Sequence, residues 1–235
     1  MTPQTAILLG ASGSVGQALL AELVASDSFD RVIVLARRPL DRTLDAKVTA
    51  RLVPDMTPET VRQAVLDALS LRDGDAVGFS VLGVGAGTAK LTLEEHRAVD
   101  VDLNAAFAQG LKASGTVRHL VFMSAIGADI KAKTTGSGAA GLARYSRVKG
   151  EAEAAVAEQG PPVVSIFRPA LIVGSQHSPK LLSTVLQLLA PLTPAKFRPI
   201  QTTQIARAMA AIARRAPAQG AVYNYPEMMA LTASV

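Results

Sequence analysis

The sequence contains no cysteine among its 235 residues. Disulfide frameworks, thiol nucleophiles, cysteine-bound zinc and iron–sulfur clusters are therefore excluded. Its three histidines, His96, His119 and His177, lie far apart in the sequence, so a histidine-based metal site is not expected. The longest apolar run, residues 181–192, is too short to span a bilayer and is interrupted by polar residues and a proline. We therefore expect no membrane span.

The sequence also lacks strong charge clustering. Its net charge of +5 comes from scattered side chains, and aromatic residues make up only 4% of the chain. Binding to nucleic acid is therefore not expected. The start of the chain, MTPQTAILLG, has no basic segment followed by a long apolar stretch, which a secretory signal requires. A cytosolic location is the resulting default expectation.

Apolar runs typical of buried strands alternate with helical patterns. The runs occupy residues 5–9, 32–36, 47–53, 76–82, 117–123 and 163–167, and helical spacing is found around 19–24, 57–69, 93–112, 142–159, 181–189 and 204–214. This alternation predicts βαβ units and hence an α/β, Rossmann-like, doubly wound parallel sheet with helices on both faces. We expect residues 1–235 to form one domain, with residues 175–200 as a small cap on the substrate side.

Three glycines, Gly10, Gly13 and Gly16, follow the first predicted strand and open the first predicted helix. Glycines at such a turn let the backbone approach a pyrophosphate, and the free N–H groups of the helix start bind it. The predicted cofactor loop comprises Gly10, Ser12, Gly13, Ser14, Val15 and Gly16. A tight turn that binds no ligand is the alternative.

Arg37 and Arg38 stand about twenty positions beyond this loop, where NAD-binding sequences carry an acidic residue. A guanidinium binds a 2′-phosphate through charge-assisted hydrogen bonds, whereas a carboxylate repels it. The pair therefore favours NADP(H) over NAD(H). The alternatives are a solvated strand end, or a role for only one of the two arginines.

Tyr145 and Lys149 form a Y-x-x-x-K pattern within a predicted helix, so their side chains share one face. A nearby ammonium favours the ionised phenol, which makes tyrosine a usable proton donor and acceptor near neutral pH. Ser124 follows the strand at 117–123, at the edge where ligands bind, and Ser137 is a weaker alternative. A surface pair of side chains and an ordinary strand-end hydroxyl are the competing interpretations.

These segments resemble the short-chain dehydrogenase/reductase superfamily. The resemblance rests on GASGSVG, on Asp55 after the third strand, on the glycine turn at Gly83, on Ser124, and on the segments YSRVK and FRPALIVG. More narrowly, VFMSAIGAD, YSRVKGEAEA and FRPALIVG are similar to the atypical, extended-type branch, which is epimerase/dehydratase-like and includes the Tat-interacting-protein-like family.

The resemblance implies a role for each matching residue. Tyr145 would be the general acid and base, Lys149 would bond the nicotinamide ribose and lower the tyrosine pKa, and Ser124 would orient the substrate oxygen. Asp55 would meet the adenine, Gly83 would pass beneath the cofactor, and the backbone after Arg168 and Pro169 would approach the nicotinamide. The implied reaction is hydride transfer between NADPH and a carbonyl or alcohol.

We expect a small or moderately apolar substrate, in a pocket between residues 127–141 and the helix at 181–189, although that helix fits core packing equally well. A sensor or regulatory protein, which binds NADP(H) and a protein partner without turnover, is the alternative function. A flavin reductase or an isomerase using the same cofactor also stays open. The superfamily further suggests a homodimer built on helices such as 93–112 and 142–159.

Overall fold

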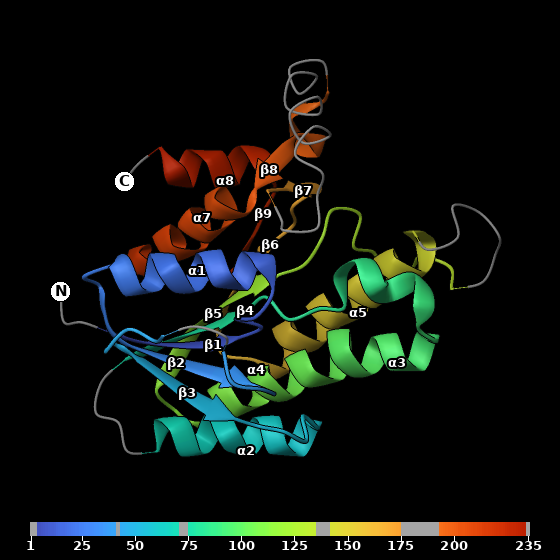
Figure 1. The fold of residues 1–235 in the computed structure, drawn as a ribbon. Coiled ribbons are helices and arrows are strands. Elements are labelled where there is room, and N and C mark those ends of the chain that lie inside the picture. Colours follow the sequence, from blue (N-terminus) through green and yellow to red (C-terminus); the bar gives the residue numbers. More distant parts are fainter. Residues whose placement is uncertain (1–3, 41–42, 71–74, 135–141, 175–192, 234–235) are drawn as a thin grey trace.

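A seven-stranded parallel sheet forms the centre of the molecule in the computed structural model, which describes residues 4–40, 43–70, 75–134, 142–174 and 193–233. The strand order is β3-β2-β1-β4-β5-β6-β9. The bounds are β1 (Gln4–Leu9), β2 (Phe29–Ala36), β3 (Val48–Leu52), β4 (Ala76–Ser80), β5 (Val117–Met123), β6 (Val163–Phe167) and β9 (Ala221–Tyr223). The direction of winding reverses at β1 and β4, which confirms the predicted doubly wound α/β fold (Figure 1).

Helices cover both faces of the sheet (Figure 1). One face carries α1 (Ser14–Ala25), α7 (Thr202–Arg215) and α8 (Tyr225–Thr232), and the other carries α2 (Pro58–Leu69), α4 (Leu103–Ala113) and α5 (Leu142–Gln159). Successive residues of β1 point to opposite faces, so Leu8 packs into the core under α1 and α7 while Ile7 packs into the core under α2 and α4. Both side chains are fully buried, which explains why the strand is apolar throughout rather than alternating.

The segment predicted as one helix over residues 93–112 is helical throughout, but it is not one regular α-helix. The structure has α3 (Leu93–Arg97), one turn of π-helix (Ala98–Asp102) and then α4. A π turn inserts an extra residue into the helical ladder, a feature frequent at functional sites. The inserted turn carries Asp100, a fully buried carboxylate whose side chain bonds outside the helix.

The C-terminal part is also more regular than predicted. β9 extends the sheet by pairing in parallel with β6, and α8 follows it. Of the predicted cap, residues 175–192 lie outside the described residues, and so does the helix predicted at 181–189. The described remainder forms a 3-10 turn (Ala195–Phe197) and β8 (Pro199–Gln201), which pairs with β7 (Leu171–Val173). Within the described part of the chain, no helix combines the length and apolar character needed to cross a bilayer.

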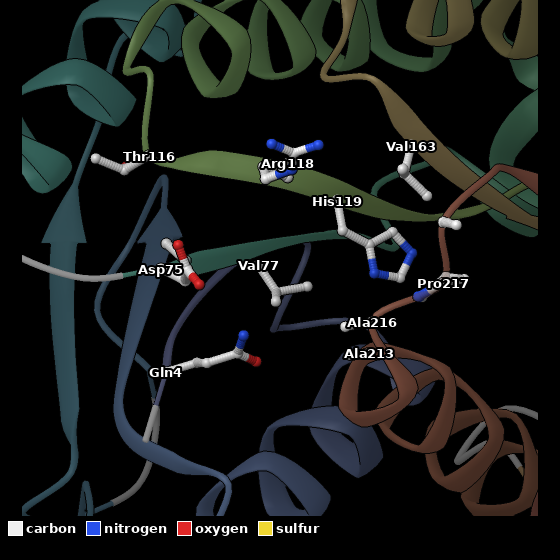
Figure 2. A pocket seen from close by; sticks show the side chains of 12 residues that line it. Gln4, Asp75, Val77, Thr116, Arg118, His119, Val163, Ala213, Ala216 and Pro217 are labelled. Carbon is white, nitrogen blue, oxygen red and sulfur yellow. The ribbon is translucent and has the colours of Figure 1, made fainter. Parts of the chain in front are cut away.

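A cavity of about 210 Å³ lies at the amino-terminal edge of the strands, opposite the glycine loop. Figure 2 shows His119 beside it, among Val77, Ala216 and Pro217. His119 Nε2 lies 2.9 Å from Ser165 Oγ, which joins β5 to β6 inside the sheet. Burial lowers the pKa of His119 to about 4, so the ring is neutral at pH 7.

His119 therefore makes stability depend on pH. An unfolded imidazole binds a proton below about pH 6.5, whereas the folded ring does so only near pH 4. The free energy of unfolding should thus fall by roughly 3 kcal/mol as the pH drops through this window, because the unfolded state binds more protons there. Urea denaturation across the window tests this. His119→Asn should flatten the pH dependence, and an unchanged slope in that variant would contradict the assignment.

Candidate active site at the carboxyl edge of the sheet

The glycine loop after β1 leaves the start of α1 open to an anion. Gly13 caps this helix without a side-chain acceptor, and the first turn contains no acidic residue. The first N–H groups of a helix need a partner from outside it, and a phosphate suits them in charge and geometry. A Cβ on Gly16 would overlap the Gly10 carbonyl oxygen, so Gly16 is required by the turn itself. A Cβ on Gly13 would meet no atom closer than 3.6 Å.

Arg37 and Arg38 follow β2, which pairs with β1, and both are exposed. Neither forms an ion pair with another described residue. Both arginines therefore lie at the end of the strand next to β1, with no described carboxylate as partner. Asp55 follows β3, one strand further out, and its carbonyl oxygen accepts hydrogen bonds from Thr57 N and Thr60 Oγ1 at the start of α2. These bonds hold the turn through the main chain of Asp55 and do not involve its carboxylate.

Lys149 is buried against Asp100, with 2.6 Å between Nζ and Oδ1. Its Nζ lies 5.7 Å from the centroid of the Tyr145 ring, one turn earlier on α5. A Cβ on Gly83 would lie 3.0 Å from Lys149 Nζ and 3.1 Å from Asp100 Oδ1. The structure therefore brings three predicted residues, Gly83, Tyr145 and Lys149, together around one ion pair. Asp100 was not predicted.

Both members of this pair stay charged. Burial alone would raise the pKa of Asp100, but the nearby His96 ring, the Lys149 ammonium and the Val84 N–H favour the carboxylate and hold its pKa below the ordinary value. Burial alone would lower the pKa of Lys149, but Asp100 beside it outweighs that effect and the pKa is raised. The site therefore holds an ammonium at neutral pH, 5.7 Å from the centroid of the Tyr145 ring.

His96 is the second residue of the site that sequence reasoning missed. It is fully buried, and its ring stacks on Tyr145 with centroids 5.9 Å apart and planes at 19°. Its Nε2 lies 3.8 Å from Asp100 Oδ1, too far for a hydrogen bond, and neither ring nitrogen has a partner among the described residues. The spacing of His96 and Asp100, four residues apart, was a signal that two polar side chains share one helix face.

Ser124 lies directly after β5 with a buried hydroxyl. Its Oγ has no hydrogen-bond partner among the described residues, while its N–H donates to Phe167 O over 2.7 Å. The competing interpretation, a hydroxyl bonded to the backbone, is therefore not what the structure shows. Ser137, the weaker alternative, lies outside the described residues.

Arg168 and Pro169 follow β6 beside Ser124. The Arg168 side chain forms a two-pronged ion pair with Glu153 on α5, which raises the pKa of the guanidinium. The Pro169 carbonyl accepts a hydrogen bond of 2.9 Å from Ile126 N. The hydrogen bond between Ile126 and Pro169 holds the loops after β5 and β6 together. The ion pair with Glu153 occupies the Arg168 guanidinium within the protein. The described residues contain no cluster of His, Asp and Glu suited to a metal ion.

Comparison with known proteins identifies the family. The model of the NAD(P)H-binding family matches residues 10–216. The chain belongs to this family. The mitochondrial protein fmp52 of Emericella nidulans is 28% identical over 183 residues, covering 78% of this chain and 73% of that protein. The rat protein HTATIP2 is 30% identical over 179 residues, covering 74% of this chain and 64% of that protein.

Solved structures share the fold. Aldohexose dehydrogenase from Thermoplasma acidophilum has a TM-score of 0.69 at 16% identity and covers 97% of this chain and 94% of that chain. A short-chain dehydrogenase from Burkholderia cenocepacia in complex with NADP has a TM-score of 0.62 at 17% identity, and the match covers 97% of this chain and 91% of that chain. With the family match and the relatives, these structures confirm an atypical, short-chain dehydrogenase-like NAD(P)-binding protein.

The expected cytosolic location is contradicted by the relatives. The similar proteins from Emericella nidulans, Eremothecium gossypii and Candida glabrata are all named as mitochondrial. The expectation rested on a missing secretory signal, and that argument does not bear on other compartments.

Two alanine variants separate a cofactor loop from a plain turn. Gly13 has φ −72°, which alanine adopts freely, so Gly13→Ala should fold normally. If the predicted loop holds the pyrophosphate, the variant should bind NADPH at least about tenfold more weakly, because the added methyl group would occupy the predicted path of the pyrophosphate. Gly16→Ala should instead lose roughly 1–3 kcal/mol of stability through overlap with Gly10.

Thermal unfolding and NADPH fluorescence titration measure the two effects. Full NADPH affinity in a folded Gly13→Ala variant would argue that no pyrophosphate passes this turn.

Proposed function

We propose that the protein is an NADPH-dependent oxidoreductase acting on a small or moderately apolar carbonyl or alcohol. The observation that carries this proposal is the buried ammonium of Lys149 beside Tyr145, at the edge of the sheet where the glycine loop opens. A charged lysine is costly to bury even beside a carboxylate, and buried charges with titratable neighbours cluster at functional sites. When bound, NADPH supplies the hydride.

The chain's own residues handle the proton and the substrate oxygen. Tyr145 donates its phenolic proton to the carbonyl oxygen during reduction and accepts one from the alcohol during oxidation. The ammonium of Lys149 favours the phenolate that forms in reduction. The Ser124 hydroxyl, which has no partner among the described residues, donates a hydrogen bond to the same substrate oxygen.

Arg37 and Arg38 support a preference for NADPH. Both are exposed beside the loop, and no described carboxylate neutralises them. A 2′-phosphate placed there would gain charge-assisted hydrogen bonds that the 2′-hydroxyl of NADH cannot offer.

Titration with NADPH and with NADH tests the preference. Replacing both arginines by alanine should weaken NADPH binding by roughly tenfold to a hundredfold, the loss expected for one or two hydrogen bonds to a charged group, and leave NADH binding unchanged. Arg51→Ala is the matched control, because Arg51 is an exposed arginine on β3. Equal affinity of the wild type for both cofactors would remove the arginine assignment.

Tyr145→Phe tests turnover. The variant keeps the ring that stacks on His96 but lacks the proton donor, so NADPH affinity should persist while carbonyl reduction falls by at least about a hundredfold. Tyr225→Phe, a tyrosine on α8, serves as the control. The assay is NADPH consumption with a panel of small aldehydes and ketones. Undiminished reduction by Tyr145→Phe would overturn the assignment, and binding without turnover by the wild type would favour the regulatory alternative.

A further inference from the structure

Asp100 is the described carboxylate that forms an ion pair with Lys149. The carboxylate of Glu153, on the same helix, also favours the charged form of Lys149, but it forms its own ion pair with Arg168. The remaining titratable groups facing the ammonium are Tyr145 and, across the carboxylate, His96. A buried ammonium that loses its counter-ion tends to lose its proton, since desolvation penalises the charged form. The charge of Lys149 therefore depends on Asp100.

The same carboxylate reaches the cofactor-side turn. Asp100 Oδ2 accepts a hydrogen bond of 2.9 Å from Val84 N, the residue after Gly83, while Oδ1 faces Lys149. One fully buried side chain thus bridges the turn that follows β4 and the lysine on α5. The π turn at Ala98–Asp102 presents this carboxylate in an otherwise helical segment.

We propose that Asp100 is a positioning residue, which keeps Lys149 charged and ties its ammonium to the turn at Gly83 and Val84. The proposal rests on the proposed function for the role of Lys149 in holding the cofactor. Asp100 touches neither the reacting atoms nor Tyr145 in this scheme; it acts through Lys149. His96 does not contact Lys149 in this scheme; its Nε2 lies 3.8 Å from Asp100 Oδ1.

Asp100→Asn tests the proposal, because asparagine keeps the volume and the acceptor for Val84 N but removes the charge. Asp102→Asn is the matched control, an exposed aspartate in the same π turn. NADPH dissociation constants are measured by nicotinamide fluorescence from about pH 6 to about pH 9, a range in which an unpartnered buried lysine titrates. The ratio of variant to wild-type constants removes the titration of the ligand itself.

The expected result is a ratio that rises with pH for Asp100→Asn, by up to about tenfold per pH unit once Lys149 loses its proton. The ratio for Asp102→Asn should stay flat near unity. Asp100→Glu, which retains a carboxylate, should restore most of the wild-type behaviour at high pH. A flat ratio for a folded Asp100→Asn would overturn the proposal.

A double-mutant cycle shows whether Asp100 acts through Lys149. In a Lys149→Met background, Asp100→Asn should add no further pH dependence, whereas independent effects would add. If Asp100→Asn fails to fold, Asp100→Glu and Lys149→Met carry the test. The dissociation constant of Asp100→Glu should stay near the wild-type value, whereas that of Lys149→Met should be raised by a similar factor at every pH, and an equal loss of affinity in both variants would contradict the proposal. All of these readouts are NADPH dissociation constants, so they do not depend on turnover. The inference about Asp100 therefore fails separately from the proposed function if Asp100→Asn shows the wild-type pH dependence while carbonyl reduction by the wild type is still lost in Tyr145→Phe.

Discussion

A buried ammonium is stable only beside a negative charge, and this constraint organises the centre of the site. Lys149 projects from α5 toward Gly83, where the Cβ of a larger residue would crowd both partners of the ion pair. Asp100 satisfies the ammonium and also receives the Val84 N–H. The π turn, the glycine and the stacked His96 and Tyr145 rings all surround this single contact.

The parallel sheet supplies the frame for this contact. The carboxyl ends of β1, β4, β5 and β6 meet at one edge, so the glycine loop, Gly83, Ser124 and Pro169 come together although they lie far apart in the sequence. Such an edge, at the point where the winding reverses, is where doubly wound folds bind ligands. The cavity beside His119 lies at the opposite edge and takes no part in this arrangement.

Local patterns predicted much of this from the sequence. The apolar runs located six of the seven sheet strands, and the spacing of glycines and of Tyr145 and Lys149 indicated the edge where we propose that the cofactor binds. Features set by long-range contacts were missed. In the sequence, Asp100 and His96 look like ordinary helix residues, because their contacts with Lys149 and Tyr145 on α5 appear only in the fold. Strand β9 has three residues, which is too short for a periodic pattern to reveal it. The π turn likewise carries a residue, Asp100, whose side-chain partners lie outside its own helix.

The most direct test of the account is a crystal structure of the protein with bound NADPH. We predict the pyrophosphate at the first turn of α1, the cofactor crossing Gly83, and a ribose hydroxyl of the nicotinamide half within hydrogen-bond distance of Lys149 Nζ, with Asp100 still paired to that lysine. A nicotinamide ring turned away from Tyr145, with Lys149 making no contact to the cofactor, would contradict the proposed chemistry while leaving the family assignment in place.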